Sequence, residues 1–149
     1  MLNLRIIYYF YVYYGHFIDE FLLELLEDVD NPKYKFYVLF KNGKSFYEEF
    51  VDSLKQAQDL DELDSIIALM DKVDNNNLPP KKFNHIVGQG KRRKDVYEFK
   101  SKHLRVYVIK KSPDFYIVLG GFKKTQEKDI DRVFRHFNVL PDYIPIKAK

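Results

Sequence analysis

The spacing of apolar residues alternates along the chain between the period of a strand and the period of a helix. Runs rich in aromatic and β-branched residues predict strands over 34–40, 96–100, 104–110 and 115–119. The tight turn at 112–114 joins the last two of these and predicts an antiparallel hairpin. Apolar residues three and four positions apart predict helices over 46–54, 60–70 and 126–138.

Local signals set the ends of these elements. Ser45 is predicted to cap the helix that follows it, with Glu48 completing a capping box. The glycine pair at 120–121 is predicted to end the sheet, and Pro141 to stop the last helix. The segment 81–94 is basic and contains two glycines, so it is predicted to be an irregular connection.

The first 32 residues precede this pattern. An aromatic run predicts a strand over 4–14. Apolar residues at helical spacing predict a helix over 17–26, and Asn31-Pro32 is a turn signal that follows it. The chain therefore divides into an amino-terminal extension (1–32), one domain (33–140) and a tail (141–149).

From Tyr34 onward the element order is strand, helices, three antiparallel strands, helix. This order predicts an α+β fold, with helices packed on one face of a twisted antiparallel sheet. The chain has 149 residues and no cysteine, so disulfides and thiolate chemistry are excluded. The apolar stretch 6–14 is too short to span a bilayer, and a cytoplasmic protein is expected. The histidines show no metal-ligand spacing, so no metal site is expected.

Charge is divided unevenly along the chain. Residues 1–80 hold 7 Lys and Arg against 15 Asp and Glu, a net charge of −8. Residues 81–149 hold 18 Lys and Arg against 7 Asp and Glu, a net charge of +11. A basic half of this kind favours phosphate binding, because counterion release drives association. Two alternatives stay open: an ordinary solvated surface, or an acidic half that folds against the basic half and covers part of it.

Two motifs in the basic half resemble a known family. The run 95–100 (DVYEFK) followed by 103–107 (HLRVY) resembles the "YELR … YRVxY" strand pair of the RelE/ParE toxin superfamily. The string 117–126 (IVLGGFKKTQ) resembles the "hxF-KKT" signature of the HigB-like, phage-derived branch of that superfamily. The resemblance covers roughly residues 33–138.

This resemblance implies a RelE-like antiparallel sheet of four strands flanked by helices. It also implies the toxin of a type II toxin-antitoxin system that causes growth arrest, with a cognate antitoxin protein as partner. The implied activity is that of an mRNA interferase at the ribosome, a metal-independent endoribonuclease with no cofactor. In such enzymes the 2′-hydroxyl of the RNA attacks the adjacent phosphate.

The resemblance assigns roles by position. Arg105 matches the strand arginine that contacts the scissile phosphate, Lys100 matches a basic strand position, and Lys123 or Lys124 matches the basic residue after the last strand. The chain departs from the family late in the domain. Asp129 and Ile130 stand where cleaving members often place Tyr or His, which puts the proton-transfer step in doubt.

Each candidate residue has a structural alternative. The guanidinium of Arg105 can stabilise the negatively charged phosphorane of RNA cleavage, or it forms a surface ion pair, for example with Glu98. Glu98 is a candidate general base or a structural partner, and His103 is a candidate acid or base or an exposed turn residue. Lys123 and Lys124 open a helix, where backbone N–H groups already favour an anion.

The densest basic run is a further candidate for RNA binding. Its alternative is an exposed, solvated loop. The run consists of Lys91, Arg92, Arg93 and Lys94.

Three functions fit this pattern. The first is the mRNA interferase. The second is a ParE-like protein of the same fold that poisons DNA gyrase and cleaves nothing. The third is a non-catalytic protein that binds nucleic acid or an antitoxin, and the missing late Tyr or His makes it credible.

Overall fold

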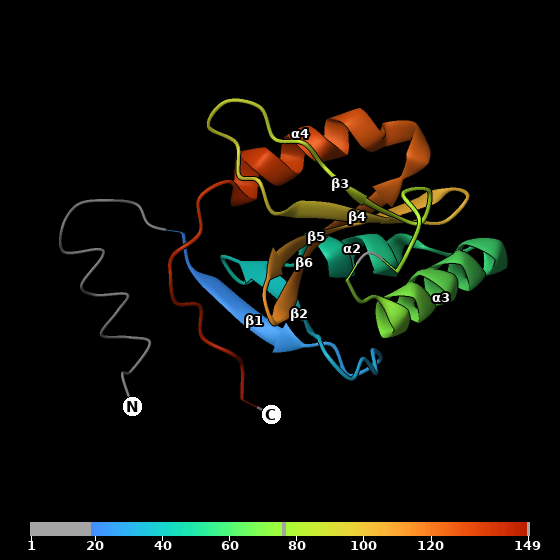
Figure 1. Cartoon of the computed structure of the whole chain (residues 1–149), viewed down its shortest axis with the longest axis horizontal. Helices are drawn as coiled ribbons and strands as arrows, with labels where there is room; N and C mark the ends of the chain where they lie inside the picture. The colour runs from blue at the N-terminus through green and yellow to red at the C-terminus, as the bar shows by residue number, and fades with distance from the viewer. Residues whose placement is uncertain (1–18, 76, 149) are drawn as a thin grey trace.

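The computed structural model describes residues 19–75 and 77–148, and a six-stranded mixed sheet is the centre of this part of the chain (Figure 1). Its order is β1-β2-β6-β5-β4-β3. The strands are β1 (Phe21–Leu25), β2 (Lys35–Lys41), β3 (Phe83–His85), β4 (Val96–Lys100), β5 (Leu104–Lys111) and β6 (Asp114–Phe122). Neighbouring strands are antiparallel, except that β2 and β6 run parallel.

Helices cover both faces of this sheet. The helices α2 (Phe46–Ser53) and α3 (Ala57–Lys72) pack on one face. The helix α4 (Gln126–Phe137), preceded by the short 3-10 helix η1 (Lys123–Thr125), packs on the other, as Figure 1 shows. The predicted α+β class is confirmed, but the expectation that the helices share one face is wrong.

Two apolar cores explain this arrangement. Along β2, Phe36 and Val38 pack in the core beneath α2 and α3, whereas Tyr37 and Leu39 pack in the core beneath α4. Successive side chains of a strand point to opposite faces. Because β2 is apolar at every position from Phe36 to Phe40, it needs cover on both sides.

Most predicted elements are present near their expected bounds. The strands β4, β5 and β6 and the helices α2, α3 and α4 all form, and the Ser45 hydroxyl accepts a hydrogen bond of 3.1 Å from the backbone N–H of Glu48. The sheet continues through the glycine pair at 120–121 to Phe122, so the prediction that these glycines end it is wrong.

The predicted helix over 17–26 is also wrong, because β1 occupies Phe21–Leu25. Phe21 and Leu23 are buried, whereas Leu22 and Glu24 are only partly buried, which is the period of a strand. β1 pairs with β2 on one side, and Leu23 exchanges backbone hydrogen bonds with residues 145–147 on the other. The predicted strand over 4–14 lies outside the described residues.

The connection predicted to be irregular over 81–94 contains β3. Phe83 pairs with Phe99 and His85 with Tyr97, so β3 extends the sheet beyond β4. The three-residue strand is too short for its period to be recognised in the sequence.

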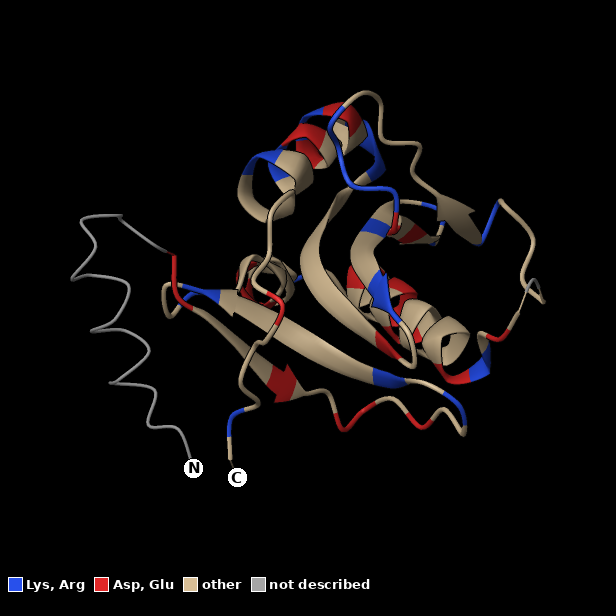
Figure 2. Ribbon diagram, turned by 60° about the vertical axis from the view of Figure 1, so that its left-hand side comes forward, with Lys and Arg blue, Asp and Glu red and all other residues tan. Residues whose placement is uncertain are grey.

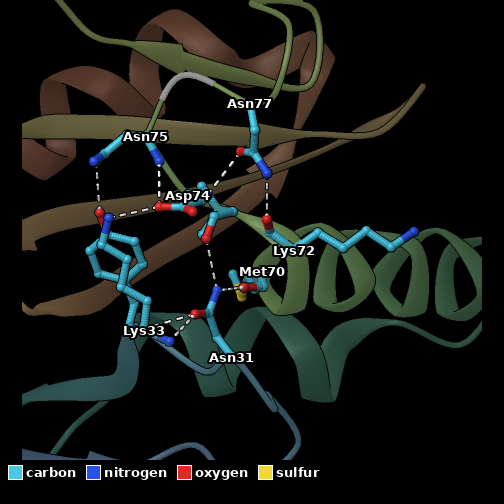
Figure 3. A network of polar contacts seen from close by, with 9 residues as sticks. Asn31, Lys33, Met70, Lys72, Asp74, Asn75 and Asn77 are labelled. Carbon is cyan, nitrogen blue, oxygen red and sulfur yellow. Dashed lines mark hydrogen bonds and ion pairs between the residues drawn. The ribbon is translucent and has the colours of Figure 1, made fainter.

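A polar network joins the end of α3 to the loop before β2 (Figure 3). The Asn31 amide donates hydrogen bonds of 2.9 Å to the carbonyls of Met70 and Val73. Its side-chain oxygen accepts from the backbone N–H groups of Lys33 and Tyr34, at 2.8 and 2.9 Å. One side chain therefore satisfies carbonyls at the end of α3 and also fixes the turn into β2.

Replacing Asn31 with alanine is expected to lower the free energy of unfolding by about 2–3 kcal/mol, because it removes several partly buried hydrogen bonds at once. Urea unfolding followed by circular dichroism measures the change. Lys33→Ala is the control, because it removes only exposed contacts, the Lys33–Asp74 ion pair and the contact of the ammonium with the Tyr34 ring, and is expected to cost much less than the Asn31 substitution. Equal losses in the two variants would contradict this role for Asn31.

Candidate nucleic-acid interface

Four strand ends meet at one end of the sheet. There β4 and β6 finish while β3 and β5 begin, and Lys100 of β4 pairs with Arg105 of β5. The backbone N–H of Lys123 donates to the carbonyl of His103 at 2.7 Å, and that of Lys100 donates to the carbonyl of Lys82 at 2.8 Å. Lysines that are distant in sequence are thereby collected in one place.

We call these lysines the basic end. They come from the approach to β3, the end of β4, the β4–β5 turn, η1 and the first turn of α4. The basic end consists of Lys82, Lys100, Lys102, Lys123, Lys124 and Lys128.

Most charges of the basic end have no internal counter-charge. Among the described residues, no ion pair involves Lys82, Lys102, Lys123 or Lys128, and all four side chains are exposed. The amino terminus of α4 adds positive potential at the same place. Exposed Glu127 lies nearby in α4, so the surface is not purely basic.

The residue expected to contact phosphate, Arg105, is largely covered. It is 7% exposed, and its Nη1 donates to the carbonyls of Ser101 and Leu104 at 2.7 and 2.8 Å. Its Nε is buried and has no hydrogen-bond partner, and neither has the hydroxyl of Tyr107, two positions along the same strand. The guanidinium is therefore partly engaged by the backbone.

The carboxylate of Glu98 is covered as well. Glu98 is 1% exposed, and both of its carboxylate oxygens accept from the Gln126 amide, at 3.0 and 2.9 Å. Lys100 lies 3.8 Å from the same carboxylate. Glu98, Lys100 and Arg105 thus lie on the α4 side of neighbouring strands, but the first turn of α4 closes over Glu98.

The ammonium of Lys124 lies toward the face of the sheet opposite Arg105. The ammonium of Lys124 lies 5.5 Å from the ring centroid of Phe122. That ring packs against Phe50 of α2, on the face opposite α4. Lys100 and Arg105 therefore lie side by side on one face at this end of the sheet, whereas Lys124 lies toward the other face.

His103 is held on the α3 side by Glu62. Its ring Nδ1 lies 2.7 Å from one carboxylate oxygen, and its backbone N–H donates to the other at 2.6 Å. The hydroxyl of Ser101 donates to Glu62 as well, at 2.6 Å. Burial alone raises the pKa of Glu62, but the hydrogen bonds from Ser101 and His103 outweigh it and lower this pKa to about 2.

This lowered pKa predicts a pH-dependent contribution to stability. A carboxyl whose pKa is depressed by folding stabilises the protein above its unfolded pKa, and this contribution is lost as the pH falls towards the folded pKa. The stability advantage of the chain over a Glu62→Gln variant is therefore expected to shrink as the pH falls from about 5 to about 2. Urea unfolding of both proteins across this range measures the advantage.

Asp61→Asn, an exposed substitution on the same helix, is the control for this experiment. An advantage of Glu62 that stays constant down to the lowest pH would contradict the assignment.

The basic run before β4 is used within the fold. Arg92 donates to Asp131 at 3.1 Å and stacks over the ring of Phe134. Arg93 donates to both carboxylate oxygens of Asp95, at 2.6 and 3.0 Å, and to the carbonyl of Phe137.

The flanking lysines differ from each other. Lys94 bonds to the carbonyl of Gly88, while Lys91 is exposed. In Figure 2 this run is the continuous blue stretch of loop that passes α4. The run therefore mainly anchors the loop to α4.

No family model, no curated protein and no solved structure matches this chain. Its function must be argued from its own residues. In the part of the chain that the structure describes, no helix is long and apolar enough to cross a membrane. Over the same residues, no group of three or more His, Cys, Asp or Glu side chains is arranged to hold a metal ion.

The sequence did not single out Lys82, Lys102 or Lys128. Each lies in a loop or a first helical turn outside the densest basic run, and only the pairing of four strand ends brings them together. The turn between β4 and β5 is a usable signal for this site. Because β5 pairs with both β4 and β6, this turn necessarily lies beside the end of β6.

Proposed function

We propose that the chain is a cytoplasmic RNA-binding protein that grips the phosphate backbone with the basic end and cleaves nothing. The observation that carries this proposal is the group of exposed lysines around the start of α4 that form no ion pair with any described residue. Each such lysine can replace condensed counterions on a nucleic acid, and their release favours binding. In terms of the resemblance to RelE/ParE toxins, the proposed protein corresponds to a non-catalytic member that still binds RNA and an antitoxin.

Burial around Arg105 favours binding over cleavage. A cleaving enzyme must bring an arginine or an equivalent charge to the phosphorane and a base to the 2′-hydroxyl. Here Glu98 is 1% exposed and Arg105 is 7% exposed, with α4 lying over the same face. A phosphate that approaches from solvent contacts the exposed lysines before it can reach Glu98 or Arg105.

Cleavage of mRNA at the ribosome is the second candidate, and one observation favours it. Glu98, Lys100 and Arg105 lie at adjacent positions of β4 and β5, and Arg105 Nε has no partner, so a movement of α4 would present a base and an arginine together. In this second candidate function the chain is a toxin that a cognate antitoxin inhibits, and it arrests growth when the antitoxin is absent.

RNA binding is tested by fluorescence anisotropy with a labelled single-stranded RNA of about 20 nucleotides, titrated at salt concentrations from about 50 to 300 mM. Contacts from four lysines predict a slope of about −3 in a plot of log binding constant against log salt. A binding constant that does not change with salt would overturn the proposal. Equal affinity for duplex DNA would point to a general polyanion surface and would equally count against RNA as the ligand.

The two candidates are separated with ribosomes and a defined mRNA. Intact mRNA in the presence of the bound chain supports the binding protein. Transcripts that are cut by the chain and left whole by an Arg105→Lys variant would establish the interferase instead. Arg105→Lys keeps the positive charge, and circular dichroism with thermal unfolding shows whether the variant is folded.

A further inference from the structure

A groove with a cavity volume of about 660 Å³ lies between α2, α3 and the connection that follows β1. Its floor is apolar, and four carboxylates stand around it. The floor is formed by Leu26, Val38, Tyr47, Val51, Leu63 and Ile67, and the rim by Asp28, Glu48, Asp52 and Asp64. We call this feature the acidic groove.

The two helices build the acidic groove in the same way. On α2, Tyr47 and Val51 are four residues apart and each is followed by a carboxylate, Glu48 or Asp52. On α3, Leu63 and Ile67 repeat this spacing. Residues four apart lie on one face of a helix, so each helix contributes an apolar stripe with acids beside it. Figure 2 shows acidic residues on these helices and on the connection after β1.

The rim carries unbalanced negative charge. All four rim carboxylates are exposed, and none forms an ion pair among the described residues. Burial raises the pKa of Glu48, and the negative charges of Glu24 and Asp52 raise it further against the opposing charge of Lys147. The carboxylates here therefore repel one another, and a cation bound in the groove would reduce this repulsion.

Tyr47 places a polar group in the groove beside the rim carboxylates. The residue is only 5% exposed and lines the groove, and its hydroxyl lies within the electrostatic influence of Asp28 and Glu48. Burial, followed by the charges of Asp28 and Glu48, raises the pKa of this hydroxyl to about 12. A protonated hydroxyl can accept a hydrogen bond from a cationic side chain that reaches the groove.

We propose that the acidic groove is a docking site for a helical segment of a partner protein that carries apolar side chains flanked by lysine or arginine. The apolar side chains lie on the floor between α2 and α3, and the cationic groups reach the rim carboxylates. An amphipathic helix docks in grooves of this kind through anchors three and four residues apart. The groove shares no residue with the basic end, so this site does not depend on RNA binding.

The test uses three synthetic peptides, acetylated and amidated, and the full chain. The first has leucine at every third or fourth position and lysine beside each leucine. In the second, glutamate replaces every lysine, and in the third, serine replaces every leucine. Calorimetric titration is expected to show binding of the first peptide and at least about ten-fold weaker binding of the other two, because one loses the charge and the other loses the apolar contact.

Variants locate the binding. Glu48→Gln, Asp52→Asn and Asp64→Asn together are expected to weaken the first peptide at least about ten-fold. A matched variant that removes three exposed carboxylates elsewhere (Asp30→Asn, Asp61→Asn, Glu127→Gln) is expected to bind as the unaltered chain does. Thermal unfolding of both variants shows that they remain folded.

Three results would overturn the proposal. One is equal binding of the lysine and glutamate peptides, and another is equal weakening in the two carboxylate variants. The third is self-association of the chain without peptide, seen by sedimentation and lost in the groove variant, which would make a second copy the occupant. RNA binding is measured on the same proteins, so failure here is distinguishable from failure of the basic end.

Discussion

Replacing Lys102, Lys123 and Lys128 together with glutamine is expected to weaken binding to single-stranded RNA by about a hundred-fold at 0.1 M salt. Each lost phosphate contact lowers the salt slope by about 0.7, so three contacts account for a change of about 2 in the slope. The side chains are exposed and form no ion pair among the described residues, so the fold is expected to tolerate the change. Anisotropy titrations across salt measure both quantities.

The matched control removes three exposed lysines elsewhere. Lys35, Lys55 and Lys72 lie on β2, between α2 and α3, and at the end of α3. Their replacement by glutamine changes the net charge by the same amount and is expected to change the affinity less than about three-fold. Equal effects in the two triple variants would show that net charge alone, rather than the basic end, determines binding.

Replacing Gly121 with alanine is expected to lower the free energy of unfolding by about 3 kcal/mol. A Cβ at this position overlaps the carboxylate of Asp129, which is 5% exposed and held by Thr125 at 2.7 Å and Arg132 at 3.2 Å. The carboxylate cannot move without losing these partners, and overpacking a buried site costs about 1–3 kcal/mol before such losses are counted. Chemical denaturation measures the change.

A double variant tests the mechanism of this loss. If the overlap with the carboxylate is the cause, Gly121→Ala combined with Asp129→Ala is expected to be more stable than the sum of the two single changes predicts. Strict additivity would mean that the added methyl acts through the backbone. Gly120 faces the opposite side, where a Cβ overlaps the ring of Phe50. The glycine pair thus allows α2 and α4 to approach opposite faces of β6.

Strands and helices with a clear period could be predicted from the sequence, and most of them were. The Ser45 cap, the hairpin of β5 and β6 and the final helix each depend on a few neighbouring residues. One failure came where two periods fit the same residues. The segment that contains Phe21, Leu23 and Leu25 satisfies helical spacing, but pairing with β2 selects the strand.

The placement of α4 could not be predicted from the local pattern. Glu98 and Lys100 lie on the same face of β4, and in the sequence this face looks exposed. In the structure Glu98 is buried beneath Gln126 instead. Burial of a carboxylate depends on a helix that comes 28 residues later in the chain. Glu98 and Arg105 are therefore less accessible than the pattern along their strands predicts.

Charge density along the sequence does not show which charges are paired within the fold. The run that holds Arg92 and Arg93 is the densest, yet both arginines have carboxylate partners, Asp131 and Asp95. Most of the dispersed lysines of the basic end, Lys100 excepted, form no ion pair with a described residue, so their charge is available to a ligand. The sequence does not show which charges form ion pairs within the fold. Those ion pairs distinguish charges with a structural role from charges that are available to a ligand.

Nuclear magnetic resonance mapping tests the central claim most directly. Backbone amide shifts of the full chain are recorded while a single-stranded RNA of about 20 nucleotides is added. The basic end predicts that the largest changes fall on residues 100–104 and 122–128. Changes confined to residues 91–94, or to α2 and α3, would contradict the account.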